Sequence, residues 1–256
     1  MNRIITTLFA LLTIQLLVVN KAYSSDGEVK DCFEKLNRAT FALNMGLDKI
    51  IFKPVSKGYR KLPSPIRTGT SNALSNLSNL ITIPNNILQG DLGSAANNSA
   101  RLIINTTLGI AGIFDPANSL GFEKRDKEDF GQTLGMMGVG EGCYLVLPVL
   151  GPSTIRDTVG SFISMNGGDV WHNITVRDDE EYVKEVKESD YWVSRVTSGV
   201  DFRAKNLEAF DSMEKNSVDL YATVRSLYLQ DRNKKINNSN SKTEAMDDGD
   251  WDTLEN

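Results

Sequence analysis

Two long stretches of this chain carry almost no charge, and they constrain its fold more than any other feature. Residues 68–110 contain only Asp91 and Arg101 as charged side chains, and residues 130–155 contain only Glu141. Asn, Ser and Thr fill the polar positions there, and these groups can meet membrane head groups or water without the cost of burying a charge. A helical hairpin in the core of a soluble protein is the alternative, but the scarcity of Lys and Glu favours a membrane interface.

A dense run of cations lies just before the first of these stretches. Residues 53–67 hold five basic residues and no acidic one: Lys53, Lys57, Arg60, Lys61 and Arg67. Each basic side chain near an anionic membrane surface contributes about 1 kcal/mol of attraction. We therefore expect these five residues to lie at a head-group interface. The formal net charge of −5 gives no indication of nucleic-acid binding.

The two ends of the chain differ from its middle. Arg3 and the uncharged run that follows it, Ile4–Val19, predict an export signal over residues 1–24, with a retained N-terminal anchor as the alternative. That run is shorter than the roughly 20 residues of a membrane-spanning helix. Residues 233–256 are rich in acids and poor in large apolar side chains, so we expect a disordered acidic tail. One helical domain is then expected over residues 25–232.

Apolar spacing predicts helix through much of that domain. The first helix has one stripe of residues at alternating steps of three and four, which are Phe33, Leu36, Thr40, Leu43, Leu47 and Ile50. We expect Pro54 to end this helix, Ser64 to cap a second one and Asp91 to cap a third that closes near Gly109.

The rest of the domain adds one short strand to this helical pattern. Further helices are expected over residues 190–213 and 219–232, and the best strand is residues 144–147 within a hairpin segment near residues 138–150. The predicted fold class is therefore mainly α.

Side chains suited to catalysis are sparse. His172 is the single histidine, which excludes the usual histidine metal clusters, and a structural or surface histidine explains it better than a catalytic base. The sequence has no Gly-x-Ser-x-Gly motif and no carboxylate pair in an apolar setting. We expect no enzyme activity, metal or cofactor. The two cysteines of an exported chain favour a disulfide.

Many ordered motifs resemble those of the VacJ/MlaA family of outer-membrane lipoproteins, across about residues 31–232. They include Lys53-Pro54-Val55, Asn86-Ile87-Leu88-Gln89-Gly90, Arg101-Leu102-Ile103-Ile104-Asn105, Asp129-Phe130-Gly131-Gln132-Thr133, Tyr144-Leu145-Val146-Leu147-Pro148, Gly151-Pro152-Ser153-Thr154-Ile155-Arg156-Asp157 and Tyr228-Leu229-Gln230.

This resemblance implies a ring-like bundle of interfacial amphipathic helices in the periplasmic leaflet of the outer membrane. Such a protein removes mislocalised phospholipids from the outer leaflet beside an outer-membrane porin. It passes them to a soluble periplasmic lipid carrier, which maintains lipid asymmetry. The alternatives are a soluble periplasmic lipid-binding or adhesion module and a membrane-associated hydrolase.

The resemblance also suggests site residues and shows two departures. Candidate lipid or channel contacts, each of which could instead be plain core, are Asn86, Leu88, Asn105, Met137, Val139, Tyr144 and Val146. Cys32 and Cys143 both replace prolines of the family, so we expect them to pair with each other. The acylated cysteine that usually follows the family's signal is not found, so interfacial helices or an uncleaved signal would anchor this chain.

Overall fold

The computed structural model describes residues 30–177 and 187–247. The expected signal, residues 1–24, therefore lies outside the described residues. The described helices and strands are α2 (Glu34–Leu47), η1 (Asp48–Phe52), α3 (Lys53–Arg60), α4 (Ser64–Leu88), α5 (Leu92–Thr107), α6 (Pro116–Ser119), α7 (Phe130–Met136), β1 (Tyr144–Leu147), β2 (Gly151–Thr154), α8 (Ile155–Ile163), η2 (Ser164–Gly168), α9 (Val170–His172), η3 (Asn173–Arg177), α10 (Glu188–Lys205), α11 (Leu207–Asn216) and α12 (Leu220–Asp247).

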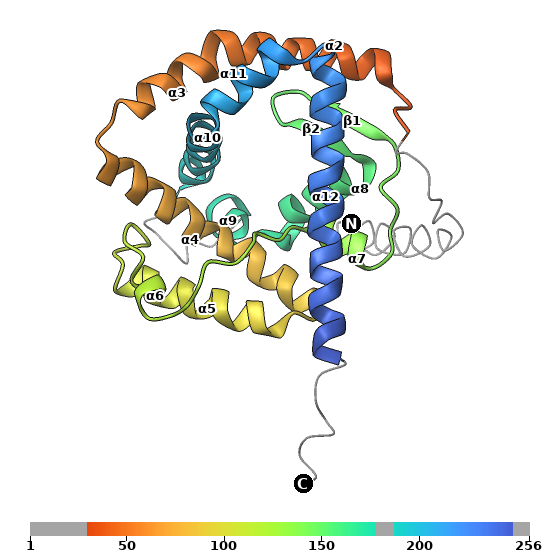
Figure 1. Ribbon diagram of the computed structural model, residues 1–256. Coiled ribbons are helices and arrows are strands. Elements are labelled where there is room, and N and C mark those ends of the chain that lie inside the picture. The colour runs from red at the N-terminus through yellow and green to blue at the C-terminus, as the bar shows by residue number, and fades with distance from the viewer. Residues whose placement is uncertain (1–29, 178–186, 248–256) are drawn as a thin grey trace.

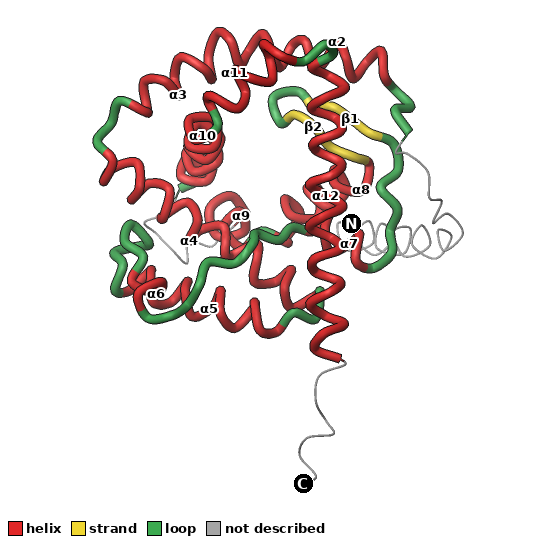
Figure 2. The backbone as a smooth tube through the Cα atoms, viewed as in Figure 1, coloured by secondary structure: helices red, strands yellow, loops and turns green. Residues whose placement is uncertain are grey.

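These elements curve into a ring, which Figure 1 shows face on. The α2–η1–α3 segment and α4 form about half of its outline, and α5 packs back against α4. The long helix α12 crosses on the side opposite the α3–α4 connection, where it contacts α7. Helix dominates the described chain, with one small hairpin of strands (Figure 2), so the prediction of a mainly α fold is confirmed.

The first helical segment continues past Pro54, where we expected it to end. A π-helical turn, η1, precedes α3, and Pro54 lies in the first turn of α3. Within this wider turn the backbone N–H of Lys53 reaches back five residues to the carbonyl of Asp48. The prediction was wrong because a π turn changes the local hydrogen-bond register and lets the chain pass a residue that has no amide hydrogen.

Helices α4 and α5 form an antiparallel pair joined at Asp91. The side chain of Asp91 accepts a hydrogen bond from the backbone N–H of Ser94, which confirms the predicted cap. Ser64 is the first helical residue of α4 and not its cap, because Pro63 precedes it in an extended conformation. After α5, Ile110, Ala111 and Gly112 all have positive φ, so the chain turns sharply at a place where most side chains would be strained.

The predicted strand is confirmed as β1, which pairs antiparallel with β2 so that Tyr144 lies opposite Thr154. The hairpin therefore extends beyond the segment near residues 138–150 that we expected. Two asparagines of α2 hold the free edge of β1. Asn37 donates to the carbonyl of Tyr144 at 3.0 Å and accepts from the N–H of Val146 at 2.9 Å, and Asn44 donates to the carbonyl of Leu147 at 2.9 Å.

The C-terminal helices differ from their expected bounds. Asn206 interrupts the expected single helix over residues 190–213, so α10 and α11 are separate. Helix α12 continues to Asp247, and Ile236 is buried against Gly135. The expected start of a disordered tail at residue 233 was therefore too early, because one apolar side chain beyond it still packs on the domain. Residues 248–256 lie outside the described residues.

Candidate functional site

The described residues place polar groups inside the protein and apolar groups outside. The buried residues comprise 24 polar or charged side chains and 10 apolar ones, while 32 large hydrophobic side chains are exposed. Water-soluble domains bury most of their large apolar residues and keep contiguous exposed apolar patches small. This distribution is the reverse of the one expected for a water-soluble domain.

Helix α2 shows the inversion most clearly. Leu36, Leu43 and Ile50 share one face of the helical segment and are 66%, 55% and 77% exposed, whereas Asn37 is buried. The apolar stripe that the spacing predicted is therefore present, but it points away from the protein. A stripe of this kind can be buried only against something outside the chain.

Apolar exposure continues on the opposite side of the ring. Leu92 and Ile103 of α5 are each 64% exposed, and the loop after α5 exposes Leu108, Ile110, Ile113 and Phe114. Helices α2 and α5 lie at opposite edges of the ring in Figure 1. We call the exposed apolar residues of α2, η1, α5 and the loop at residues 108–114 the apolar belt.

The interior is a network of uncharged polar side chains between α4, α5 and α7. The Oγ1 of Thr133 donates to Asn85 at 2.6 Å and accepts from Gln89 at 2.9 Å, and Asn98 donates to Asn86 at 2.9 Å. Buried polar groups are tolerated when they pair with one another. The asparagines and threonines of the charge-poor stretch are thus the structural core of this hairpin.

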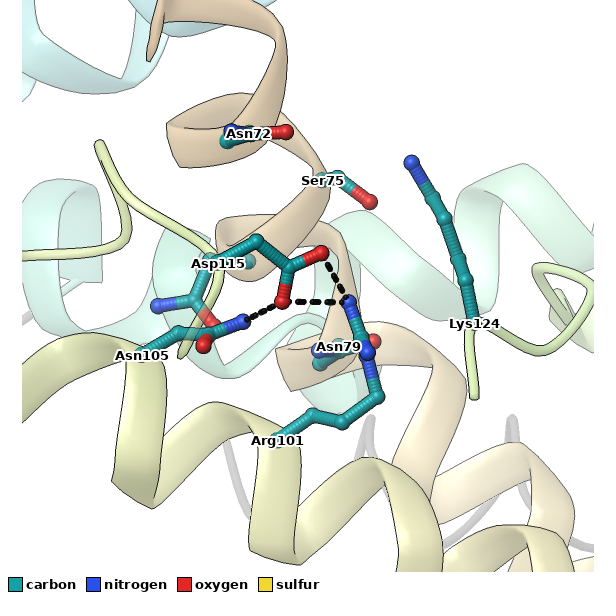
Figure 3. A pocket seen from close by; sticks show the side chains of 8 residues that line it. Asn72, Ser75, Asn79, Arg101, Asn105, Asp115 and Lys124 are labelled. Atoms are coloured by element: carbon teal, nitrogen blue, oxygen red, sulfur yellow. Dashed lines mark hydrogen bonds and ion pairs between the residues drawn. The ribbon is translucent and has the colours of Figure 1, made fainter. Parts of the chain in front are cut away.

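One charged pair lies in the same layer, beside a small pocket between α4, α5 and the start of α6 (Figure 3). Arg101 forms an ion pair with Asp115 at 2.8 Å, and Asn105 donates to Asp115 at 2.9 Å. Burial favours a higher pKa for Asp115, but the hydrogen bonds from Arg101 and Asn105 outweigh it and lower the pKa. Asn72, Ser75, Asn76, Asn79 and Lys124 complete the lining.

This pocket measures about 10 Å³, which is about the space that one water molecule needs. It is too small for a lipid head group. Its ion pair therefore acts within the fold, where it ties α5 to the segment that follows the sharp turn at Ile110.

The candidate contact residues occupy three different environments. Asn86 and Asn105 are buried in the polar interior, and Leu88 and Met137 are exposed at 51% and 60%. Val139 is half-buried in the loop after α7. Tyr144 and Val146 are buried in an apolar core with Tyr221, next to Phe41 and Tyr228. The seven residues therefore do not share one surface. Tyr144 and Val146 are part of the apolar core, which was the alternative to lipid contact at these positions.

The five basic residues of residues 53–67 do not share one environment in the structure. Lys53 forms an ion pair with Asp211 of α11 at 2.8 Å, and Arg60 forms one with Glu208. Arg67 donates to the carbonyl of Leu62 at 3.1 Å. Lys57 and Lys61 are exposed and have no ion pair within the described residues. Lys53 and Arg60 therefore hold α11 against α3, a partnership that the local sequence could not show.

A buried ionic cluster was missed entirely at the sequence level. Arg232 of α12 bridges Asp129 at 2.6 Å and Asp157 at 2.8 Å, and Tyr228 donates to Asp157 at 2.5 Å. Burial raises the pKa of Tyr228, and the charge of Asp157 raises it further. The cluster joins α7, α8 and α12. Asp129, Asp157 and Tyr228 fall in motifs that carry the family resemblance, which was the one available signal.

His172 and the cysteines have structural positions. The imidazole of His172 packs edge-on against Tyr191 with ring centroids 4.9 Å apart. Cys32 and Cys143 form a disulfide between the start of the domain and the strand β1, as the resemblance suggested. Within residues 30–177 and 187–247, no group of acidic, histidine or cysteine side chains could hold a metal, and no helix could span a bilayer.

Comparison with known proteins gives consistent matches over most of the chain. The family model of the MlaA lipoprotein matches residues 29–235. An uncharacterized protein of Rickettsia prowazekii is 35% identical over 210 residues, which are 82% of this chain and 79% of that protein. The intermembrane phospholipid transport system lipoprotein MlaA of Escherichia coli K12 is 33% identical over 205 residues, which are 78% and 76% of the two chains.

A solved structure shows the same fold. It comes from work on the structural basis for maintenance of bacterial outer membrane lipid asymmetry, and it superposes with a TM-score of 0.67 at 30% identity. The match covers 81% of this chain and 99% of the other. With the family model matching nearly the whole described domain, this chain belongs to the MlaA lipoprotein family.

Proposed function

We propose that this chain is a phospholipid transport component of the outer membrane, which sits in the periplasmic leaflet and removes mislocalised phospholipids from the outer leaflet. The lipid would then pass to a soluble periplasmic carrier, and an outer-membrane porin would hold the ring in place. Family membership and the likeness to a lipid-asymmetry structure support the general role.

The observation that carries this proposal is the inverted distribution of side chains. Fully burying a Leu or Ile side chain contributes about 1.5–3 kcal/mol. The exposed stripe of Leu36, Leu43 and Ile50 would gain this energy in a leaflet of lipid tails and forgo it in water. Because α2 and α5 expose apolar residues at opposite edges of the ring, lipid would surround the ring and not merely touch one side of it.

The ring shape supports transport instead of simple adhesion. A ring with an apolar outside and a hydrogen-bonded polar inside can keep a head group in a polar environment while the tails stay in the leaflet. Apart from Arg67 and Arg101, the polar side chains of α4 and α5 are neutral, so they could face a lipid head group without a strong ionic attraction to it.

Vesicle flotation tests the membrane placement. The mature chain should float with vesicles of phosphatidylethanolamine and phosphatidylglycerol. Changing Leu36, Leu43 and Ile50 together to Lys removes about 1.5 kcal/mol at each position, so partitioning should fall by about three orders of magnitude. A matched control changes three exposed residues of the charged helix α11 to Lys, namely Ala209, Ser212 and Asn216. This control adds the same charge and should float like the wild type.

Two outcomes would overturn the placement. One is a wild-type chain that stays monodisperse in plain buffer and ignores vesicles, which would favour the soluble lipid-binding or adhesion module. The other is equal flotation of the two triple variants, which would show that the stripe does not meet lipid.

Transport itself is tested in cells. A deletion strain should accumulate phospholipid on the cell surface, and the wild-type gene should reverse this accumulation. His172→Gln should restore the strain equally well, because the imidazole packs against Tyr191 and titration of it has no part in the proposal. Failure of this variant to complement, with normal protein levels, would favour a hydrolase.

A further inference from the structure

The segment formed by η1 and α3 carries a row of cations on one side. Lys53, Lys57 and Lys61 follow one another at steps of four, so they lie on the same side of the helix. Arg60 lies next to this row, and Lys49 of η1 precedes it by one more step of four. We call these five residues the basic face. Five positive charges on one side of a short segment attract anionic groups.

Exposed apolar side chains accompany the basic face. Ile50 and Ile51 of η1 and Val55 of α3 are all exposed, and the first two belong to the apolar belt. An interfacial helix places its apolar side chains among the lipid tails and its cations at the depth of the lipid phosphates. With Ile50 and Ile51 in the leaflet, the basic face therefore lies beside the phosphates.

Helix α11 covers part of the basic face with acidic side chains, and it runs beside α3 in Figure 1. The ion pairs that join α11 to the η1–α3 segment include, in order along the face, Lys49–Glu214 at 3.2 Å, Lys53–Asp211 at 2.8 Å and Arg60–Glu208. Lys57 and Lys61 form no ion pair with any carboxylate that the structure describes. The carboxylates of α11 thus lie beside three of the five cations, where phosphate oxygens could otherwise bind.

These ion pairs are exposed, and α11 packs only shallowly on the ring. Leu207, at the start of the helix, is the one buried residue among the ten that the structure describes in α11. Phe210 packs edge-on against Phe202 of α10, but the side chains of Lys49 and Glu208 are 69% and 73% exposed. Exposed ion pairs contribute little to stability, because water and salt screen them. Other anions can therefore compete with these carboxylates for the cations.

We propose that the basic face is a binding surface for anionic phospholipid head groups, and that the carboxylates of α11 compete with those head groups for its cations. Phosphatidylglycerol fits this chemistry, because its head group has no amine to balance the phosphate. The carboxylates weaken the hold of the ring on anionic lipid without removing it, since Lys57 and Lys61 have no described acidic partner. This inference rests on the proposed placement of the ring in a leaflet, and it adds the class of lipid bound there and the groups that limit its binding.

Binding of the mature chain to vesicles tests this competition. Asp211→Asn with Glu214→Gln releases Lys53 and Lys49 from their ion pairs. Each released cation should strengthen binding to vesicles of phosphatidylcholine and phosphatidylglycerol by about fivefold, hence about 30-fold together. Vesicles of phosphatidylcholine alone should bind this variant like the wild type, which also shows that the variant is folded.

The matched control removes the same charge elsewhere. Glu123→Gln with Asp126→Asn neutralises two exposed acids in the loop between α6 and α7. Because neither acid pairs with a cation of the basic face, this control should strengthen binding to the anionic vesicles by much less than the α11 variant.

A double-mutant cycle separates competition from a general effect of net charge. The substitutions Asp211→Asn and Glu214→Gln are repeated in a chain that also carries Lys49→Gln and Lys53→Gln. The gain in binding should then shrink to that of the control, because the cations that the carboxylates masked are gone. A purely additive effect of charge would give the same gain with and without the two lysines.

Each result decides the inference. A large gain that needs both phosphatidylglycerol and the two lysines supports it. The inference is refuted by a gain no larger than that of the control, by a gain that persists without the lysines, or by an equal gain on neutral vesicles. Failure of the proposed function has a different signature: a wild-type chain that binds neither kind of vesicle is not placed in a membrane, whatever the α11 variants do.

Discussion

Removal of the Cys32–Cys143 disulfide should lower the stability of this protein by a calculable amount. The two cysteines are 111 positions apart in the sequence. In the chain-entropy model, the cross-link restricts an unfolded loop of that length and contributes about 5 kcal/mol to the free energy of unfolding. Engineered and native bridges often give somewhat less, so we expect a loss of about 3–5 kcal/mol.

The fold should survive this loss, because other contacts hold the same junction. The N–H of Tyr144 donates to the carbonyl of Lys30 at 2.9 Å, and Asn37 bonds both Asp31 and the edge of β1. The start of the domain therefore stays attached to the hairpin in the native state. The expected effect is a lower unfolding temperature, on the order of 10 °C, and not an unfolded protein.

Thermal unfolding in detergent measures this effect, with and without reductant. The Cys32→Ser, Cys143→Ser double variant should match the reduced wild type, and reductant should not change the variant further. An unfolding temperature that stays within about 2 °C of the oxidised wild type would refute the entropic reasoning. Intact mass with and without reductant gives the control that the bridge was present at the start.

Three further predictions concern the packing of the ring. Asn37→Ala leaves buried backbone groups of β1 without partners, so the free energy of unfolding in denaturant should fall by about 2–4 kcal/mol. A fall below about 1 kcal/mol would contradict the inference that Asn37 holds the hairpin against α2. Gly160→Ala should lower the free energy of unfolding by at least about 2 kcal/mol, because a Cβ there would lie 2.3 Å from the backbone of α7. The control Gly46→Ala places a Cβ where nothing lies within 4 Å, so it should be neutral or slightly stabilising. Similar effects of the two substitutions would show that α7 and α8 are not in tight contact at Gly160. Burial favours a higher pKa for Asp129, but the hydrogen bond and charge of Arg232 outweigh burial and lower this pKa. The ionised Asp129 therefore stabilises the folded protein fully at pH values above the unfolded pKa of about 3.9, and this stabilisation is lost as the pH falls through the folded pKa. The unfolding temperature should therefore fall below about pH 4, and Asp129→Asn should be less stable at neutral pH with a flatter acid limb; an unchanged acid limb in this variant would contradict the role of Asp129.

The sequence predicted the elements of the candidate site better than their roles. The charge-poor stretch at residues 68–110 was correctly expected to be helical and polar without charge, and Asp91 was correctly expected to cap a helix. The asparagines were expected at a lipid interface, yet Asn86 and Asn98 are buried partners of each other, and buried Asn76 donates to Thr106. The sequence shows which donor and acceptor groups a side chain carries. The residue that it bonds depends on which helices pack together.

The local pattern determined where this chain is helical, where it forms a strand, and which stripes are apolar. Only the tertiary structure decided the direction of those stripes, because a helix with Leu36, Leu43 and Ile50 on one face is equally helical whether that face meets a core or a membrane. The same holds for charge. The cations of residues 53–67 looked like one interface, but Lys53 and Arg60 form ion pairs with acids some 150 residues later, on α11, while Lys57 and Lys61 form none among the described residues. Pairing over such distances follows from closure of the ring, which no local spacing encodes.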